Sequence, residues 1–171
     1  MESAPYTPLR QLKFPLLTKI QEVAKRAEAF GMKIQYHNRH PLPSSVFPSA
    51  KYVSFSDLIA TSDVISLNLA LTHETSHILS AAEFAQMKHG VVIVNTARGG
   101  LIDEEAMIAA LEEGKVWSVG LDVFENEPRV DERLLRSERV VVSPHIGAAT
   151  VETMVSRCLF VEDWDEGEEG G

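Results

Sequence analysis

Residues 91–127, VVIVNTARGGLIDEEAMIAALEEGKVWSVGLDVFENE, decide the fold of this chain. The first four are apolar and β-branched, as in a buried strand. After a loop that contains two glycines, apolar side chains recur at helical spacing from Asp103 to Glu113, and a second apolar run ends at Asp122. The stretch therefore predicts a strand, a loop, an amphipathic helix and a second strand in direct succession.

The polar residues of this stretch fall where its strands end. Asn95 and Arg98 follow the first strand, while Asp122 and Glu127 follow the second. In open α/β sheets, ligands bind at the carboxyl ends of the strands. We therefore expect these side chains to form part of a functional site.

The rest of the chain alternates short strands and helices in the same way. Hydrophobic spacing predicts further strands at 9–14, 32–37, 64–68 and 140–143, and helices from about residue 16 to 30, around 57–59, 81–87, 132–135 and 151–160. Ser54 or Ser56, Ser80 and Asp103 are predicted helix caps, and Gly31 is a predicted helix stop. Strands that are apolar on both faces and alternate with helices predict a Rossmann-like, doubly wound parallel α/β sheet.

Composition fits one α/β domain in a chain of 171 residues, with 44% hydrophobic and 24% charged residues. A single cysteine, Cys158, excludes an internal disulfide framework and favours a reducing compartment. No apolar run approaches the roughly 20 residues that span a bilayer, and the first residues lack the pattern of a secretory signal. We therefore expect a cytoplasmic protein without a membrane segment.

The net charge of −9 is concentrated at the C-terminus, because the last ten residues, EDWDEGEEGG, contain six acids and no base. We expect this tail to be disordered and solvated. Nucleic-acid binding requires clustered Lys and Arg, so the acidic balance argues against a nucleic-acid partner.

Three ordered motifs resemble the nucleotide-binding domain of the D-isomer-specific 2-hydroxyacid dehydrogenases. They are VVIVNTARGGLIDEEAMIAALEEGKV from residue 91, GLDVFENEP from residue 120 and SPHIGAAT from residue 143. The residues YHNR at 36–39 resemble the glyoxylate/hydroxypyruvate reductase branch. The resemblance extends over about residues 22–153, and it implies an NAD(P)-dependent oxidoreductase that acts on a small 2-keto or 2-hydroxy acid.

The resemblance also implies a catalytic role for three residues. Arg98 would bind the substrate carboxylate, since a guanidinium offers two parallel donors. His145 would be the general acid in reduction and the base in the reverse direction. Glu127 would hold the other imidazole nitrogen, with Glu125 as the nearby alternative acid.

Cofactor-binding residues follow from the same resemblance. Those implied are Asn38, Arg39, Leu69, Thr96, Ala97, Arg98, Asp122, His145, Gly147 and Ala148. An NAD-specific domain usually places an acid after the second strand, where this sequence has Asn38 and Arg39. This difference favours NADPH over NADH.

Two departures from the family separate an unusual N-terminal segment, 1–21, and an unusual C-terminal segment, 154–171, from the expected domain at 22–153. The glycine-rich turn G-x-G-x-x-G is replaced by PLLTKIQ at 15–21, which would keep a pyrophosphate away from the next helix. Family members also carry a separate substrate domain. We therefore expect a truncated dehydrogenase whose isolated chain has little or no activity.

Alternative functions have weaker support. The segment HETSH at 73–77 fits a zinc-protease pattern, which needs both histidines on one helix face, but it is predicted to lie in a loop, so we expect no metal site. Gly99 and Gly100 precede Leu101 rather than a lysine, which argues against a P-loop. The main alternative is a catalytically inactive nucleotide-binding or dimerisation module, and a homodimer is expected by resemblance.

Overall fold

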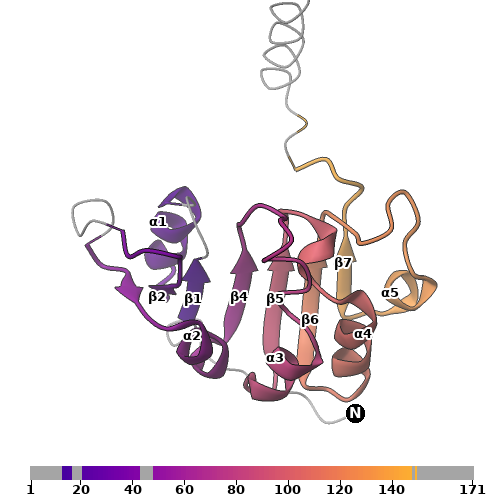
Figure 1. Ribbon diagram of the computed structural model, residues 1–171, viewed down its shortest axis with the longest axis horizontal. Coiled ribbons are helices and arrows are strands. Elements are labelled where there is room, and N and C mark those ends of the chain that lie inside the picture. The colour runs from indigo at the N-terminus through magenta and orange to yellow at the C-terminus, as the bar shows by residue number, and fades with distance from the viewer. Residues whose placement is uncertain (1–12, 17–20, 43–47, 148, 150–171) are drawn as a thin grey trace, which may run out of the picture.

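The computed structural model describes residues 13–16, 21–42, 48–147 and 149. The described strands form one parallel sheet in the order β3-β2-β1-β4-β5-β6-β7 (Figure 1). The strands are β1 (Lys13–Leu16), β2 (Lys33–Tyr36), β3 (Lys51–Tyr52), β4 (Val64–Leu67), β5 (Val91–Asn95), β6 (Val116–Leu121) and β7 (Val140–Val142). The predicted Rossmann-like, doubly wound fold is confirmed.

The helices lie on both faces of this sheet. They are α1 (Gln21–Ala29), α2 (Phe55–Thr61), α3 (Ala81–Gln86), α4 (Glu104–Glu112) and α5 (Glu132–Arg136), with a short 3₁₀ turn, η2 (Gly99–Leu101). The chain steps in one direction from β1 to β2 and in the other from β4 to β6. Because parallel crossovers are right-handed, α1 covers one face while α3 and α4 cover the other. The strand order reverses between β1 and β4, where ligands bind in such folds.

The larger described core lies between β4, β5, β6 and the helices α3 and α4. Ile65, Ile93 and Val119 fill it from the strands, and Phe84 and Met107 from the helices, each at most 3% exposed. A smaller cluster joins α1 to β2. Removal of such side chains from water is the main stabilising contribution to the fold, at roughly 25 cal/mol per Å².

The predicted helix caps are confirmed. Ser54 rather than Ser56 caps α2, since its hydroxyl accepts from the amide of Asp57 at 3.0 Å. Ser80 precedes α3 and its amide donates to Glu83 at 3.0 Å, while Asp103 accepts from the amide of Ala106 at 3.0 Å before α4. These contacts satisfy amide hydrogens that have no partner inside the helix.

The N-terminal prediction requires correction. Helical spacing predicted a helix from about Leu16, yet Leu16 ends β1 and α1 begins at Gln21. Leu16 pairs with Tyr36 on one side and with Ser66 on the other, so sheet pairing outweighs the local helical pattern. The strand predicted at 9–14 overlaps β1 at 13–14, residues 9–12 lie outside the described residues, and β1 lies between β2 and β4 in the sheet.

One strand was not predicted, and one predicted helix lies outside the described residues. The strand β3 was not predicted, because Lys51 and Tyr52 are both exposed and leave no apolar pattern. The helix predicted at 151–160 and the acidic tail lie outside the described residues. None of the described helices combines the length and apolar character needed to cross a membrane.

Candidate active site

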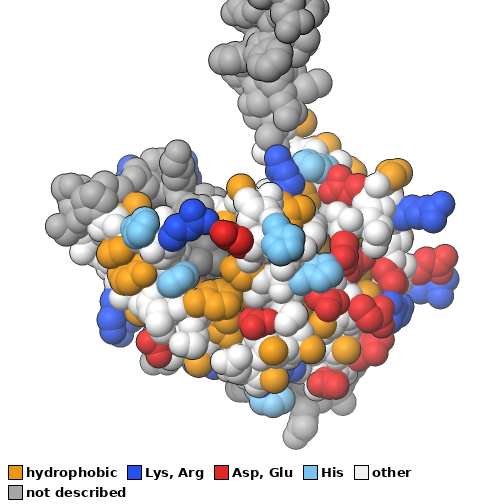
Figure 2. Space-filling model, viewed as in Figure 1, with side chains coloured by type: hydrophobic (Ala, Val, Ile, Leu, Met, Phe, Trp, Pro, Cys, Tyr) orange, Lys and Arg blue, Asp and Glu red, His pale blue; other side chains and the backbone are white. Residues whose placement is uncertain are grey.

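All described strands are parallel, so the residues that follow them meet at one edge of the sheet. Figure 2 shows histidine, basic and acidic side chains gathered beyond the strand ends seen in Figure 1. Arg98 follows β5, Asp122 and Glu127 follow β6, and His145 follows β7. The sheet order β5-β6-β7 therefore brings them to adjacent positions along this edge.

Asp122 supports the loop that carries His145. It is 7% exposed, and its two carboxylate oxygens accept from the amides of Ile146 at 3.0 Å and Gly147 at 2.8 Å. Partial burial acts to raise the pKa of Asp122, but hydrogen bonds from the Ser143 side chain and from these two amides outweigh it, so the pKa lies below its ordinary value. Asp122 is therefore ionised and fixes the backbone beside His145.

Glu127 and His145 form a hydrogen-bonded pair. His145 Nδ1 lies 2.9 Å from Glu127 Oε2, and the other oxygen of Glu127 accepts from the Phe124 amide at 3.0 Å. The bond to His145 is the main cause that lowers the pKa of Glu127, followed by the Phe124 amide. Because a carboxylate only accepts, Nδ1 carries a proton and Nε2 is the nitrogen left for proton exchange.

The loop after β5 presents Arg98. Asn95 is 1% exposed and holds both ends of this loop, since it accepts from the Ala97 amide at 3.1 Å and donates to the Arg98 carbonyl at 2.9 Å. The Arg98 guanidinium is exposed, and within the described residues its hydrogen bond is to the neighbouring Ala97 carbonyl, at 2.6 Å. Gly99 is required here, because a Cβ would lie 1.9 Å from the Phe124 backbone.

An open hollow of about 590 Å³ lies beside Arg98. Leu69 and Ala97 line it together with Asn68, Ala70, Leu71 and Arg98, from the ends of β4 and β5. Four of these six residues are apolar, as is common in ligand pockets. Thr96 is exposed next to it, and Ala148 lies outside the described residues.

Asn38 and Arg39 occupy the end of β2, across the switch point from this hollow. The Asn38 side chain accepts from the Arg39 amide at 2.9 Å, which shapes the turn. The Arg39 guanidinium is largely exposed and pairs with Glu74 at 3.1 Å. An exposed guanidinium at this place can donate hydrogen bonds to a phosphate group.

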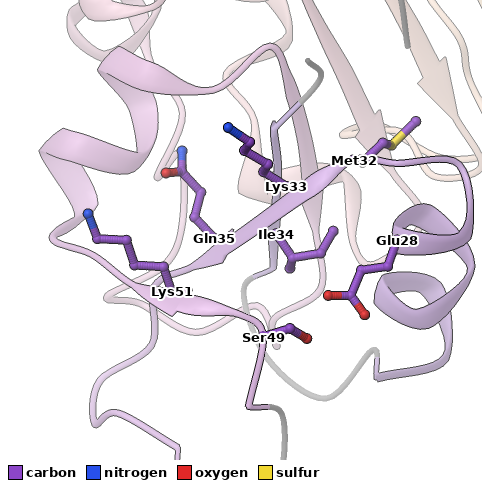
Figure 3. A pocket seen from close by; sticks show the side chains of 7 residues that line it. All are labelled: Glu28, Met32, Lys33, Ile34, Gln35, Ser49 and Lys51. Carbon is purple, nitrogen blue, oxygen red and sulfur yellow. The ribbon is translucent and has the colours of Figure 1, made fainter. Parts of the chain in front are cut away.

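A second hollow, of about 470 Å³, lies at the amino end of β2 and away from these residues. Figure 3 shows that Lys33, Gln35 and Lys51 line it from β2 and β3, with Glu28 on α1. The Gln35 amide is already bonded to Thr61 at 2.9 Å. This hollow brings no second residue set with catalytic chemistry.

The segment HETSH forms turns rather than a helix, as predicted. His77 has a positive φ of 51° and its Nε2 lies 2.6 Å from Glu125 Oε1. Within the described ranges, no group of three or more His, Cys, Asp and Glu side chains is arranged to hold a metal ion. The zinc-protease pattern at 73–77 therefore lacks its required geometry.

The family model described as "D-isomer specific 2-hydroxyacid dehydrogenase, NAD binding domain" matches residues 20–147. The chain belongs to this family. The matched range of the dehydrogenase domain contains β2 to β7 and every described residue of the candidate site. Family membership supports a nicotinamide dinucleotide as the cofactor.

Relatives of this dehydrogenase domain include reductases of several 2-keto acids. The 4-methyl-2-oxopentanoate reductase A of Aspergillus oryzae is 57% identical over 141 residues, which are 82% of this chain and 43% of that protein. The hydroxypyruvate reductase of Thermotoga maritima is 51% identical over 135 residues, 77% of this chain and 44% of that protein. A crystal structure of a glyoxylate reductase from Paecilomyes thermophila has a TM-score of 0.85 and 54% identity, covering 90% of this chain and 48% of that one. The chain spans less than half the length of these proteins.

Sequence reasoning missed one set of contacts in the dehydrogenase domain. Glu104 and Glu125 each donate a backbone amide to the other's carboxylate, at 3.3 and 3.1 Å. Burial is the largest cause that raises the pKa of Glu104. A glutamate directly after the Asp103 cap is favourable at the positive end of the helix dipole on local grounds alone, and no local pattern links it to Glu125.

Proposed function

We propose that the protein is an oxidoreductase that reduces a small 2-keto acid, glyoxylate or hydroxypyruvate, with NADPH. The observation that carries this proposal is the 2.9 Å hydrogen bond from His145 to Glu127, at the sheet edge that also presents Arg98. Relatives named as hydroxypyruvate reductase and glyoxylate reductase support the substrate class. The proposed domain comprises residues 22–153.

In this proposal, three side chains perform the protein's part of the reaction. Arg98 binds the substrate carboxylate through two parallel donors and polarises the carbonyl. His145 Nε2 gives a proton to the carbonyl oxygen, and Glu127 stabilises the charged imidazole and fixes its orientation. When bound, the nicotinamide supplies the hydride.

The cofactor would lie along the carboxyl edge. Leu69, Thr96 and Ala97 would contact it beside the 590 Å³ hollow, and Asp122, Gly147 and Ala148 would contact the nicotinamide end. The fit is supported by the tight approach at Gly147, where a Cβ would lie 2.7 Å from Asp122 Oδ2, so that a side chain here would require Asp122 or the loop that carries His145 to shift. Arg39, with Asn38, would bind a 2′-phosphate, which is why we propose NADPH.

A second candidate function is a catalytically inactive nucleotide-binding or dimerisation module. It is favoured by PLLTKIQ at 15–21, in place of a glycine-rich turn. In this alternative the domain binds nucleotide or pairs with a second copy but does not turn over. We propose a homodimer for either function.

Nucleotide titration and a kinetic assay test these proposals. The chain is titrated with NADPH and NADH by protein fluorescence, and NADPH oxidation is followed with glyoxylate and with hydroxypyruvate. Turnover that falls by about 10²- to 10⁴-fold in His145→Gln supports the enzyme. Binding without turnover supports the inactive module or a need for further protein, and failure to bind either nucleotide contradicts the cofactor proposal.

Cofactor preference has its own variant. Arg39→Gln removes the cation proposed for the 2′-phosphate, and a hydrogen bond to a charged group contributes about 1.5–3 kcal/mol. We expect NADPH affinity to fall by about tenfold or more, with NADH affinity unchanged. Equal losses for both nucleotides would remove Arg39 from the phosphate site.

A further inference from the structure

We propose that His77, Glu125 and Glu104 form a positioning network that holds Glu127 in place against His145. The catalytic meaning of this network rests on the proposed function, but its geometry does not. His77 belongs to the HETSH segment, which the proposed reaction leaves without a role.

The position of the Glu127 carboxylate depends on the backbone just before it. One of its carboxylate oxygens accepts from the Phe124 amide at 3.0 Å and the other accepts from His145. A shift of residues 124 and 125 therefore moves the carboxylate that holds the imidazole. Side-chain exposures of 37% for Glu127 and 48% for His145 show that little packing restrains the pair itself.

The first residue of α4 holds this backbone through hydrogen bonds. The Glu125 amide donates to Glu104 Oε2 at 3.1 Å, and the Glu104 amide donates to Glu125 Oε2 at 3.3 Å. These reciprocal bonds join the loop after β6 to the first turn of the helix. Gly99 adds a close contact, since its position leaves no space for a Cβ beside the Phe124 backbone.

The His77 imidazole binds the second carboxylate oxygen of Glu125. Its Nε2 lies 2.6 Å from Glu125 Oε1, so both oxygens of that carboxylate are bonded. The position of His77 is itself fixed, because its amide donates to the Gly100 carbonyl at 2.9 Å and its φ of 51° is one that L-residues rarely adopt. Strain at a polar residue of this kind persists where surrounding contacts require it.

Together these contacts connect three loops of the candidate site. The loop after β4 carries His77, the start of α4 carries Glu104, and the loop after β6 carries Glu125 and Glu127. The Leu79 amide also donates to the Leu101 carbonyl at 3.2 Å, which fixes the first loop to the second. Loss of His77 should therefore displace Glu127 without any direct contact between the two residues.

The experiment measures the Glu127 carboxyl directly by carbon-13 NMR, in chain labelled at the glutamate carboxyl groups and assigned with Glu127→Gln. It compares the wild type with His77→Ala, His77→Gln and His73→Ala. Gln keeps an N–H donor for Glu125, and His73 lies in the same turn but, within the described residues, has no hydrogen bond to Glu125. His77→Ala and His77→Gln keep a Cβ at the same positive φ, so they share any backbone cost.

We expect the proton affinity of Glu127 to rise by at least about twofold in His77→Ala, the smallest effect typical of residues that share one network. His77→Gln should restore the wild-type titration in large part, and His73→Ala should leave it unchanged. An unchanged Glu127 titration in folded His77→Ala, or an equal change in His73→Ala, would overturn the network. Should His77→Ala fail to fold, Glu125→Gln weakens the same contact and replaces it.

This readout needs neither cofactor nor substrate, so it separates the two proposals. A Glu127 titration that responds to His77→Ala in a chain that binds no nucleotide supports the network and contradicts the proposed function. Nucleotide binding together with a Glu127 titration that does not change in His77→Ala supports the proposed function and contradicts the network.

Discussion

Two glutamates of the loop after β6 each pair with a histidine from another loop, and the two histidine–glutamate pairs differ in their surroundings. Glu127 holds His145 at 2.9 Å, and Glu125, two residues earlier, holds His77 at 2.6 Å. In the first pair the carboxylate has one further partner, the Phe124 amide, and the imidazole keeps a nitrogen for exchange. In the second, the carboxylate is also bonded to the start of α4. We call Glu127–His145 the open pair and Glu125–His77 the closed pair, because only the second carboxylate also joins the loop to α4.

The largest loss of stability should come from a buried apolar residue that joins the loops of His77 and Arg98. Leu101 is fully buried, between the His77 and Arg98 loops. Leu101→Ala should lower the free energy of unfolding by about 3 kcal/mol through the cavity it leaves. Denaturation with urea measures this, and Leu135→Ala, at an exposed leucine, should cost less than about 0.5 kcal/mol. Similar losses in both variants would show that Leu101 is not packed as described.

The supports of the two pairs should differ next. Asp122→Asn turns an amide group toward the Ile146 or Gly147 amide, so we expect a loss of about 2 kcal/mol in unfolding free energy. Glu104→Gln keeps one acceptor oxygen for the Glu125 amide, and we expect a loss below about 1 kcal/mol. Calorimetry on the matched variants checks the order, and a larger loss in Glu104→Gln would reverse the comparison.

Acid sensitivity should distinguish the open pair. The pKa of Glu127 lies below its ordinary 4.5, so its ionised form stabilises the fold above about pH 4.5, and this contribution is lost as the pH falls below 4.5 through the folded-state pKa. Glu127→Gln should flatten the decline of stability below pH 4.5, within the roughly 0.2–1 kcal/mol of exposed pairs. His145→Gln should flatten it similarly, because it removes the main cause of the shift. Denaturation at several pH values provides the measurement, and an unaltered acid limb in both variants would contradict the pairing.

The smallest effect should come from a third pair, Arg39 with Glu74, in the same HETSH segment as His77. Both side chains are about three-quarters exposed, so solvent screens the 3.1 Å contact. Glu74→Gln should change the unfolding free energy by less than about 0.5 kcal/mol in urea denaturation. A clearly larger loss would mean that the Arg39–Glu74 pair stabilises the HETSH turn despite its exposure.

Sequence reasoning went furthest where the determinants are local. The strands β4 to β7 were predicted because strands of a parallel sheet are apolar on both faces, and the caps Ser80, Asp103 and either Ser54 or Ser56 because caps satisfy nearby amides. The same reasoning failed at Leu16, where helical spacing was real but pairing with Tyr36 and Ser66 decided the outcome. The catalytic and cofactor roles given to the site residues stay predictions until the assays are made.

The sequence by itself determined the strand–loop–helix–strand unit at 91–127 and the edge at which its polar residues lie, because hydrophobic period and parallel topology follow from short-range pattern. The Glu127–His145 contact was implied by the family resemblance, and only the tertiary structure decided that Glu125 meets His77. Glu125 and Glu127 are two residues apart, yet their partners lie 48 residues before the one and 18 residues after the other. These partners depend on the order of β4, β6 and β7 in the sheet and on the hydrogen bonds between α4 and the loop after β6. No local sequence pattern predicts either.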